Sequence, residues 1–500
     1  MMAKLQETLD STQAAGKRVL VVGLGISGLE SAWYLTRRGI PVTVIEKQSE
    51  ASFLSKSKFA SELSGLRKAG VSVVFGLDGE HIAPHLMDAG LVLLSPGVPI
   101  ESAIVGAIKR YKVPFVAEFE LGLQLHSGKS IVVTGSNGKS TTSSLIDHIL
   151  KLGGHPSFLC GNIGVPVISR EELLRDLDGN ESVLVVEASS YQLEACTLLK
   201  PAVSVVLNIS ENHLERHGSL ERYAAAKSRA LRLQTTEDLA VVNADDPVVM
   251  EMAGSCRATQ AVFGSKSEVE LQKLSATWAQ LSPLSGAQGE IVVSWHGARE
   301  EYSTDNTKLL GTHNRYNMAA AILVARHMGV APEVVQRALD SFLPLEHRLE
   351  MVWNDARRCV INDSKSTTVA ASLAALTTVL GHFSSSPLVL MVGGLSKAGS
   401  WKPLLSKISE QTGRMVLVVC FGKDGSLLAS HCRASDVPHV VSPNLREATR
   451  EALGRVALGG VALLSPGCAS FDEFVDFDHR GTEFKRYVQE DLASEIGASA

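Results

Sequence analysis

The chain is built from short apolar runs rich in Val, Leu and Ile, most of them followed by a glycine-rich or polar turn. Such runs are typical of strands buried on both faces of a parallel sheet. The segments between the runs have helical patterns, and strands that alternate with helices indicate βαβ units. The runs lie at residues 18–25, 42–46, 91–97, 130–140, 183–190, 203–210, 239–246, 359–365, 387–394, 415–422 and 460–467.

These runs form three groups, and we expect each group to fold as one α/β domain. A chain of 500 residues is long enough for about three domains. The predicted domains are 1–118, 119–344 and 345–500. Two more polar segments, 290–297 and 300–311, are predicted to be short antiparallel strands added to the middle domain.

Composition narrows the class of protein. Hydrophobic residues make up 45% and charged residues 20%, values typical of a globular chain with several cores. The formal charge of −5 argues against a nucleic-acid partner. The seven scattered cysteines fit neither zinc-finger spacing nor a disulfide framework. No apolar run approaches the length of a membrane span and the N-terminus has no signal-like run, so we expect a soluble cytoplasmic protein with no membrane partner.

A glycine fingerprint follows the first apolar run. Gly23, Gly25 and Gly28 stand where a strand turns into a helix, and Glu46 ends the next run. Glycines at this spacing let the backbone approach a pyrophosphate at a helix N-terminus. Two ligands remain open on this pattern: NAD, with Glu46 on a ribose, or another nucleotide diphosphate such as a UDP-sugar. A purely structural turn is a third possibility. The segment 95–97 ends another strand and could close the same crevice.

A phosphate loop opens the second group of runs. It lies between an apolar strand and a helical segment, the context that such a loop requires. Its backbone N–H groups would cradle phosphates, Lys139 would neutralise their charge and Ser140 would bind Mg²⁺. The loop is a variant, because Val133 occupies the position of the usual first glycine. The predicted ATP-binding residues of the loop are Gly135, Ser136, Asn137, Gly138, Lys139, Ser140 and Thr141.

Two later turns carry candidate metal ligands. Glu187 and His213 each follow an apolar strand, and the carboxyl ends of parallel strands line a ligand crevice. Mg²⁺ prefers oxygen ligands, so Glu187 is the stronger candidate. The segment 311–317 opens a helix and presents His313, Asn314 and Asn317 toward a base or a phosphate.

Eight motifs occur in the order found in the Mur ligases, a family of ATP-dependent amide-forming enzymes. The chain therefore resembles this family from about residue 17 to 490. The segments 23–31 and 465–484 resemble those of the members that add D-glutamate. The eight motifs are TGSNGKST (134–141), GNIG (161–164), EASSYQLE (187–194), NISENHLERHGSLERYAAAK (208–227), GTHNRYN (311–317), HRLE (347–350), INDSKST (361–367) and LSPGCASFDEF (464–474).

The resemblance implies a Rossmann-like UDP-binding domain, a central P-loop-type ATPase domain with a mainly parallel sheet, and a Rossmann-like C-terminal domain that binds the amino acid. It implies a ligase that adds D-glutamate to UDP-N-acetylmuramoyl-L-alanine through an acyl phosphate, in cytoplasmic peptidoglycan precursor synthesis. A sister ligase adding another amino acid is the alternative. Two alternatives come from other functional classes: an NAD-dependent oxidoreductase and a non-catalytic nucleotide-gated binding protein. The combination of motifs argues against both. We expect the protein to be a monomer.

The resemblance also assigns roles to individual residues. It implies two Mg²⁺ ions and a carbamylated Lys227. Glu46 and Lys47 stand where the family often has Asp-Thr. The predicted metal ligands are Ser140, Glu187, His213 and Lys227, with Lys139, Glu187, His213 and Lys227 as the catalytic set. The UDP-sugar set is Gly25, Ile26, Ser27, Glu46, Lys47, Ser95, Pro96, Gly97 and Asn162. The nucleotide set gains His313, Asn314, Asn317, Arg348, Asp363 and Lys365. The D-glutamate set is Thr367, Lys397, Ser470, Phe471 and Phe477.

Overall fold

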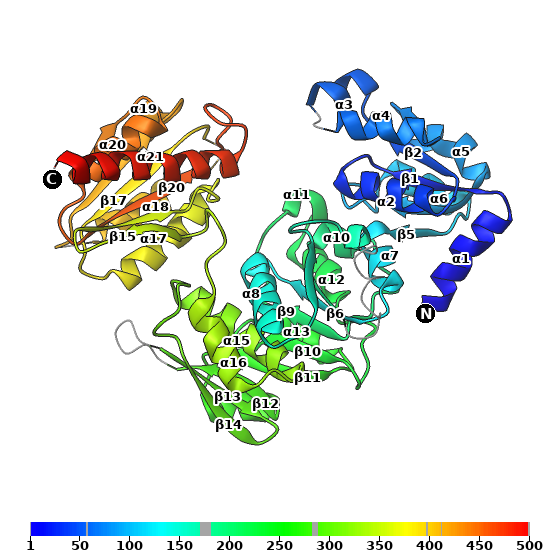
Figure 1. Cartoon of the computed structure of the whole chain (residues 1–500), viewed down its shortest axis with the longest axis horizontal. Coiled ribbons are helices and arrows are strands. Elements are labelled where there is room, and N and C mark those ends of the chain that lie inside the picture. Colours follow the sequence, from blue (N-terminus) through cyan, green and yellow to red (C-terminus); the bar gives the residue numbers. More distant parts are fainter. Residues whose placement is uncertain are drawn as a thin grey trace. The chain divides into compact units, whose positions relative to one another are not determined.

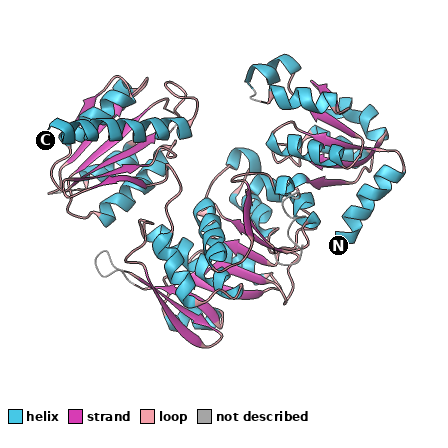
Figure 2. Ribbon diagram, in the orientation of Figure 1, coloured by secondary structure: helices cyan, strands magenta, loops and turns pink. Residues whose placement is uncertain are grey.

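Three β-sheets follow one another along the chain, each flanked by helices (Figures 1 and 2). The structure is a computed structural model that describes residues 2–56, 59–170, 182–282, 289–396, 399–411 and 413–498. It confirms the predicted three-domain α/β fold. By internal contacts the chain divides into two compact units, Met1–Asn306 with Arg315–Asp340, and Thr307–Asn314 with Ser341–Ala500. The boundaries at 118 and 344 stay predictions, and each falls between two sheets.

The first sheet has five parallel strands in the order β3-β2-β1-β4-β5. β1 and β4 are adjacent in the sheet but far apart in sequence, so the strand order reverses at β1. Ligands of open α/β sheets bind at such a reversal. The strands are β1 (Arg18–Val22), β2 (Val42–Glu46), β3 (Ser72–Phe75), β4 (Ala89–Leu94) and β5 (Phe115–Ala117). The helices are α1 (Met2–Ala14), α2 (Ile26–Arg37), α3 (Glu50–Lys56), α4 (Ala60–Lys68), η1 (Gly79–Ile82), α5 (Ala83–Met87), α6 (Ala103–Arg110) and α7 (Glu118–Leu125).

We expect Gly28→Ala to lower the melting temperature markedly, because the turn between β1 and α2 leaves no room for a side chain. A Cβ at Gly28 would lie 1.9 Å from the carbonyl oxygen of Gly23. Gly25→Ala is the matched control in the same turn, since a Cβ there meets nothing within 4 Å. Thermal unfolding of the two variants checks the prediction, and equal melting temperatures would contradict it.

The second sheet has nine strands in the order β14-β13-β12-β11-β10-β9-β6-β8-β7. Strands β6 to β12 run parallel to one another. β13 and β14 form an antiparallel hairpin at the edge of the sheet, as predicted for this region. The strands are β6 (Lys129–Thr134), β7 (Ser157–Gly161), β8 (Val183–Glu187), β9 (Val203–Val206), β10 (Leu239–Asn243), β11 (Thr259–Gly264), β12 (Thr277–Leu281), β13 (Glu290–Trp295) and β14 (Ala298–Ser303). The helices are α8 (Lys139–Leu152), η2 (Val167–Arg170), α10 (Ser190–Glu194), α11 (Leu214–His217), α12 (Leu220–Ser228), α13 (Pro247–Gly254), α14 (Glu268–Leu274), α15 (Thr312–His327) and α16 (Pro332–Ser341).

The third sheet has six strands in the order β15-β16-β20-β17-β18-β19, and only β15 is antiparallel to its neighbour. The last strand, β20, is buried along its whole length between β16 and β17. The strands are β15 (Glu350–Asn354), β16 (Arg358–Asn362), β17 (Leu388–Gly393), β18 (Val416–Phe421), β19 (His439–Val441) and β20 (Gly460–Gly467). The helices are α17 (Val369–His382), α18 (Lys402–Ser409), α19 (Gly425–Ala434), α20 (Leu445–Arg455) and α21 (Phe477–Ala498).

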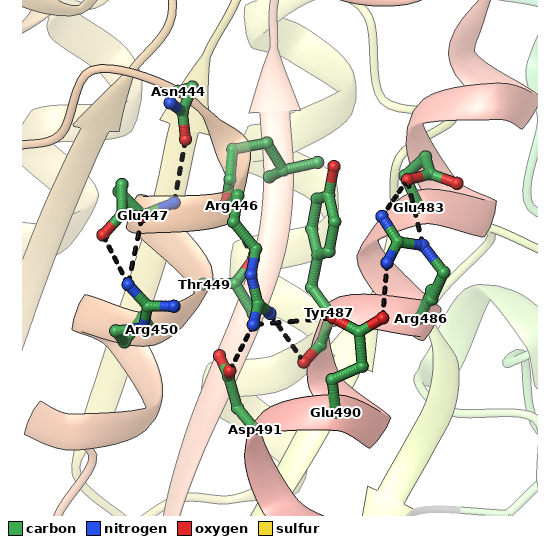
Figure 3. A network of polar contacts seen from close by, with 11 residues as sticks. Asn444, Arg446, Glu447, Thr449, Arg450, Glu483, Arg486, Tyr487, Glu490 and Asp491 are labelled. Atoms are coloured by element: carbon green, nitrogen blue, oxygen red, sulfur yellow. Dashed lines mark hydrogen bonds and ion pairs between the residues drawn. The ribbon is translucent and has the colours of Figure 1, made fainter.

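The C-terminal helix α21 is fastened to α20 by a polar network (Figure 3). Arg446 pairs with Asp491 at 2.7 Å and also donates to the backbone carbonyl of Tyr487. The guanidinium groups of Arg446 and Arg486 lie 5.0 and 4.7 Å from the centre of the Tyr487 ring. These contacts hold the helix whose first turns carry Phe477 and Arg480. Among the described residues, no helix is long and apolar enough to span a membrane.

Candidate active site

The phosphate loop joins β6 to α8, in the strand–loop–helix context that the sequence predicts. Gly135 and Gly138 have φ angles of +150° and +84°, conformations that side chains disfavour. A Cβ at Gly138 would lie 2.3 Å from Oδ1 of Asn317 on α15. The fold therefore brings Asn317, a predicted nucleotide residue, against the loop.

Neighbouring turns hold the loop in shape. Asn208 accepts a hydrogen bond from the Asn137 N–H at 2.8 Å and donates one to the Asn137 carbonyl at 3.1 Å. The Ser136 hydroxyl donates to the Ser210 carbonyl at 3.1 Å and lies 3.2 Å from the Tyr223 hydroxyl. Asn208, Ser210 and Tyr223 were not predicted as site residues. Their only signal in the sequence is their place within the motif 208–227.

Two lysines share the carbonyl oxygens of the loop. Lys139 Nζ donates to Gly135 and Ser136 at 2.9 and 3.0 Å, and Lys227 Nζ donates to Gly135 at 2.9 Å and to Thr134 Oγ1 at 3.2 Å. Lys227 is buried. Burial, with the charge of Lys139 as a second cause, lowers the pKa of Lys227 to about 6, against the attraction of Glu187. Lys227 is therefore mainly a neutral amine at pH 7.

Glu187 ends β8 and is buried, with 2% of its surface exposed. Its Oε1 accepts a hydrogen bond from Asn162 Nδ2 at 2.7 Å. Its Oε2 is buried and has no hydrogen-bond partner among the described residues. Burying an unpaired carboxylate oxygen is unfavourable, so this atom suits a cation. Asn162, which the resemblance assigns to the UDP-sugar, thus lies in the central domain against the predicted metal ligand.

His213 has different neighbours from Glu187. Its backbone is left-handed, with φ of +54°, and it precedes the short helix α11. Its Nδ1 lies 3.1 Å from the Tyr191 hydroxyl and 3.4 Å from Glu215. Within the described part of the chain, no three His, Cys, Asp or Glu side chains gather as a metal-binding group. A metal site at Glu187 would therefore draw on other ligand types, such as those predicted at Ser140 and Lys227.

In the first domain the predicted UDP-sugar residues surround the glycine turn. Both oxygens of Glu46 are engaged by this domain, since they accept from the N–H groups of Leu24 and Gln48 at 2.9 and 3.0 Å. Ser95 Oγ donates to the Gly23 carbonyl at 2.9 Å. Because Glu46 accepts from the N–H group of Leu24, it holds the backbone of the glycine turn. Lys47 pairs with Asp78 at 2.8 Å. Ile26, with 49% exposure, and Ser27 stand at the N-terminus of α2.

The remaining residues of the predicted nucleotide set belong to the second compact unit. Asp363 accepts from Ser366 at 2.5 Å and from Ser465 at 2.8 Å, and burial raises the pKa of Asp363 to about 6. Burial, together with the charge of Arg348, lowers the pKa of His313. Asn314 donates to the Leu310 carbonyl at 2.7 Å.

The predicted D-glutamate residues also lie in this second unit. Ser470 is buried, Phe471 is 69% exposed and Thr367 is half-buried, whereas Lys397 lies outside the described residues. Lys365 Nζ lies 5.2 Å from the centre of the Phe477 ring, so a predicted nucleotide residue and a predicted D-glutamate residue are neighbours.

Arg480 is a buried residue that sequence reasoning missed. It donates to the Ser364 carbonyl and hydroxyl at 2.8 and 3.0 Å and to the Cys468 carbonyl at 3.1 Å. It thereby joins the turn after β16 to the turn after β20, which carry Asp363 and Ser470. Its sequence signal was weak, because a lone arginine in a helix is usually solvated.

The fold and the phosphate loop define a nucleotide-binding α/β enzyme with three domains. Residues 17–117 match the Mur ligase MurD-like N-terminal domain, and residues 133–325 match the Mur ligase middle domain. The chain belongs to the Mur ligase family.

Individual proteins are similar to this chain in sequence or in structure over nearly its whole length. The UDP-N-acetylmuramoylalanine–D-glutamate ligase of Koribacter versatilis is 35% identical over 95% of this chain and 97% of its own length. The ligase of the same name from Acidobacterium capsulatum is also 35% identical, over 95% and 96%. Among solved structures, UDP-N-acetylmuramate-alanine ligase MurC from Thermotoga maritima is 20% identical over 96% of this chain and all of its own, with a TM-score of 0.57. MurF from Acinetobacter baumannii is 16% identical over 97% and 98%, with a TM-score of 0.58.

Proposed function

We infer that this chain is an ATP-dependent ligase that joins D-glutamate to UDP-N-acetylmuramoyl-L-alanine during peptidoglycan precursor synthesis. One observation carries this conclusion: relatives of that name are 35% identical over 95% of the chain. The MurD-like match of residues 17–117 supports the same member of the family. We further propose that it works as a cytoplasmic monomer.

The reaction activates a carboxylate and then forms an amide. An oxygen of the alanyl carboxylate attacks the γ-phosphorus of ATP, the bond to ADP breaks, and an acyl phosphate forms. The amine of D-glutamate attacks the acyl carbon, phosphate leaves, and the ammonium proton is released. Phosphoryl transfer between anions depends on alignment and charge neutralisation. We propose that the N-terminus of α8 and Lys139 supply both, whereas the N–H groups of Ser136 and Asn137 donate to Asn208.

The buried oxygen of Glu187 fits a divalent cation, and Ser140, Glu187, His213 and Lys227 would hold the two Mg²⁺ ions that we propose. Bound Mg²⁺ supplies positive charge to the phosphates. We propose that Lys227 carries a carbamate, formed when its neutral amine attacks CO₂ and loses a proton. The pKa of about 6 supports this, because the neutral amine is the reactive form. The carbamate would convert a neutral amine into an anionic oxygen ligand.

The first domain is proposed to bind the UDP part of the substrate through the turn at 25–27 and the segment 95–97. We expect UDP to raise the melting temperature of the protein increasingly as its concentration rises, because a ligand that binds only the native state stabilises it. NAD is expected to have no effect. A shift with NAD and none with UDP would overturn this assignment.

The whole function is tested by phosphate release from ATP in the presence of UDP-N-acetylmuramoyl-L-alanine and one amino acid at a time. D-Glutamate is expected to support turnover, whereas L-glutamate, L-alanine and diaminopimelate are not. We propose that Thr367, Lys397, Ser470, Phe471 and Phe477 make this choice. Turnover with another amino acid alone would identify a sister ligase.

A further inference from the structure

We propose that Arg216 is a positioning residue that fixes the spacing between the UDP-sugar turn and the helix start that carries His213. The UDP-sugar turn is defined here as residues 95–98. This inference rests on the proposed function, which assigns that turn to the substrate. Arg216 belongs to α11 in the central domain, whereas the turn follows β4 in the first domain.

The guanidinium of Arg216 holds three consecutive carbonyl groups of the turn. It donates to the carbonyls of Gly97 at 3.2 Å, Val98 at 3.0 Å and Pro96 at 3.5 Å. The charge is balanced by Glu194 of α10, whose carboxylate accepts from Arg216 Nε at 2.9 Å. Only 12% of the Arg216 side chain and 14% of the Glu194 side chain are exposed. A planar cation with several donors in a fixed array suits this task, and a lysine cannot replace it.

The same arginine contacts the surroundings of His213. Its guanidinium lies 4.9 Å from the centre of the Tyr191 ring, and the Tyr191 hydroxyl lies 3.1 Å from His213 Nδ1. The rings of Tyr191 and His213 are 5.0 Å apart. A partner on one ring nitrogen orients a histidine so that the other nitrogen can bind a metal. Arg216 thus touches the substrate turn and the ring that supports His213.

The proposed reaction requires a fixed distance between the UDP-sugar turn and the phosphate loop. The substrate is bound at its UDP end by the first domain, but its carboxylate must reach the phosphate loop of the central domain. The spacing between the two sites must then be fixed, because misplacing reacting groups by about 1 Å can cost roughly 100-fold in rate. Arg216 sets this spacing from within α11, three residues after His213.

A second arginine joins the same two domains and provides a matched control. Arg222 pairs with Glu101 at 3.3 Å, but 66% and 75% of these side chains are exposed. Exposed ion pairs contribute little, because solvent screens them and the side chains lose entropy. Arg222→Ala should therefore leave ligand binding and turnover within about twofold of the wild type.

The test measures UDP affinity by titration calorimetry without ATP or Mg²⁺, and ADP affinity in a separate titration. We expect Arg216→Lys and Arg216→Ala to weaken UDP binding by about 10- to 100-fold, the range for lost hydrogen bonds to a charged group. ADP affinity should change by less than about twofold, because within the described residues the Arg216 side chain donates to Glu194 and to the carbonyls of 96–98 and not to the phosphate loop. In turnover assays, kcat should fall and the KM for the UDP-sugar should rise, while the KM for ATP stays constant.

Unchanged UDP affinity in both variants would overturn the proposal. An equal loss of UDP and ADP affinity would also overturn it, because Arg216 would then support the fold in general. Melting temperatures identify a variant that does not fold, and Arg216→Lys, the milder change, then decides. A wild-type protein that binds no UDP would instead contradict the proposed function, so the two failures are distinguishable.

Discussion

Lys227→Arg is expected to remove nearly all turnover, by about 10³-fold or more, although it keeps a basic side chain. Lys227 is buried, and its amine is mainly neutral at pH 7 because burial lowers its pKa to about 6. A guanidinium stays charged and cannot form a carbamate. It would also place a second permanent cation beside Lys139 in a buried site, without supplying the anionic oxygens that Mg²⁺ prefers.

Steady-state phosphate release measures this effect, and Lys200→Arg is a matched control. Lys200 pairs with Asp238 at 3.3 Å in the same domain, and an arginine can keep that pair, so turnover should stay normal. A ¹³C NMR signal from labelled carbonate tests the carbamate directly. Acetate or formate should restore part of the activity of Lys227→Ala by supplying an oxygen anion. Near-normal turnover in Lys227→Arg would exclude the carbamate role.

The same lysine predicts a pH dependence. Turnover should fall as pH drops through about 6, because protonation of the amine prevents carbamate formation. The unfolded chain binds a proton on this group up to a pKa near 10.5, whereas the native chain without the carbamate loses it near 6. The contribution of Lys227 to the free energy of unfolding therefore rises with pH between these values. Lys227→Met should remove that slope, as measured by denaturant unfolding without CO₂.

Lys139→Ala is expected to lower turnover by about 10²- to 10³-fold. In this variant, the positive charge of Lys139 would no longer stabilise the negative charge that develops on the transferred phosphate. Lys139 is the first residue of α8, and its Nζ donates to the carbonyls of Gly135 and Ser136 in the loop that we propose binds the phosphates. The affinity for ATP should fall in the same variant, while UDP affinity should stay constant. Turnover assays and separate titrations with ATP and UDP measure the three quantities.

Lys151→Ala is the control for this change. Lys151 lies on the same helix, pairs with Asp147 at 2.7 Å and is 57% exposed, so its loss should leave turnover unchanged. If Lys139→Ala kept normal ATP affinity and turnover, the segment 134–141 would be a structural turn, and the nucleotide would bind elsewhere.

Local sequence patterns are enough to predict the strands and turns of this protein. Runs such as 183–187 and 203–206 are buried at every position, so their apolar residues alone indicated strands covered on both faces. The glycines of the phosphate loop likewise indicated a turn, because Gly135 and Gly138 need backbone angles that other residues avoid. Both signals depend on residues that are close in sequence, which is why they could be read without a structure.

Contacts between residues that are distant in the sequence depend on how the chain folds. Lys227 on its helix gives no sign of burial, yet the fold places its amine against the carbonyl of Gly135, 92 residues earlier. Arg216 reaches the carbonyl of Val98 across 118 residues, and Asn162 reaches Glu187 from the turn that follows the neighbouring strand. Such contacts follow from strand order and helix packing, which no local pattern encodes. The pKa of Lys227 and the anchoring of the UDP-sugar turn are therefore properties of the folded chain, whereas the elements that carry them are properties of the sequence.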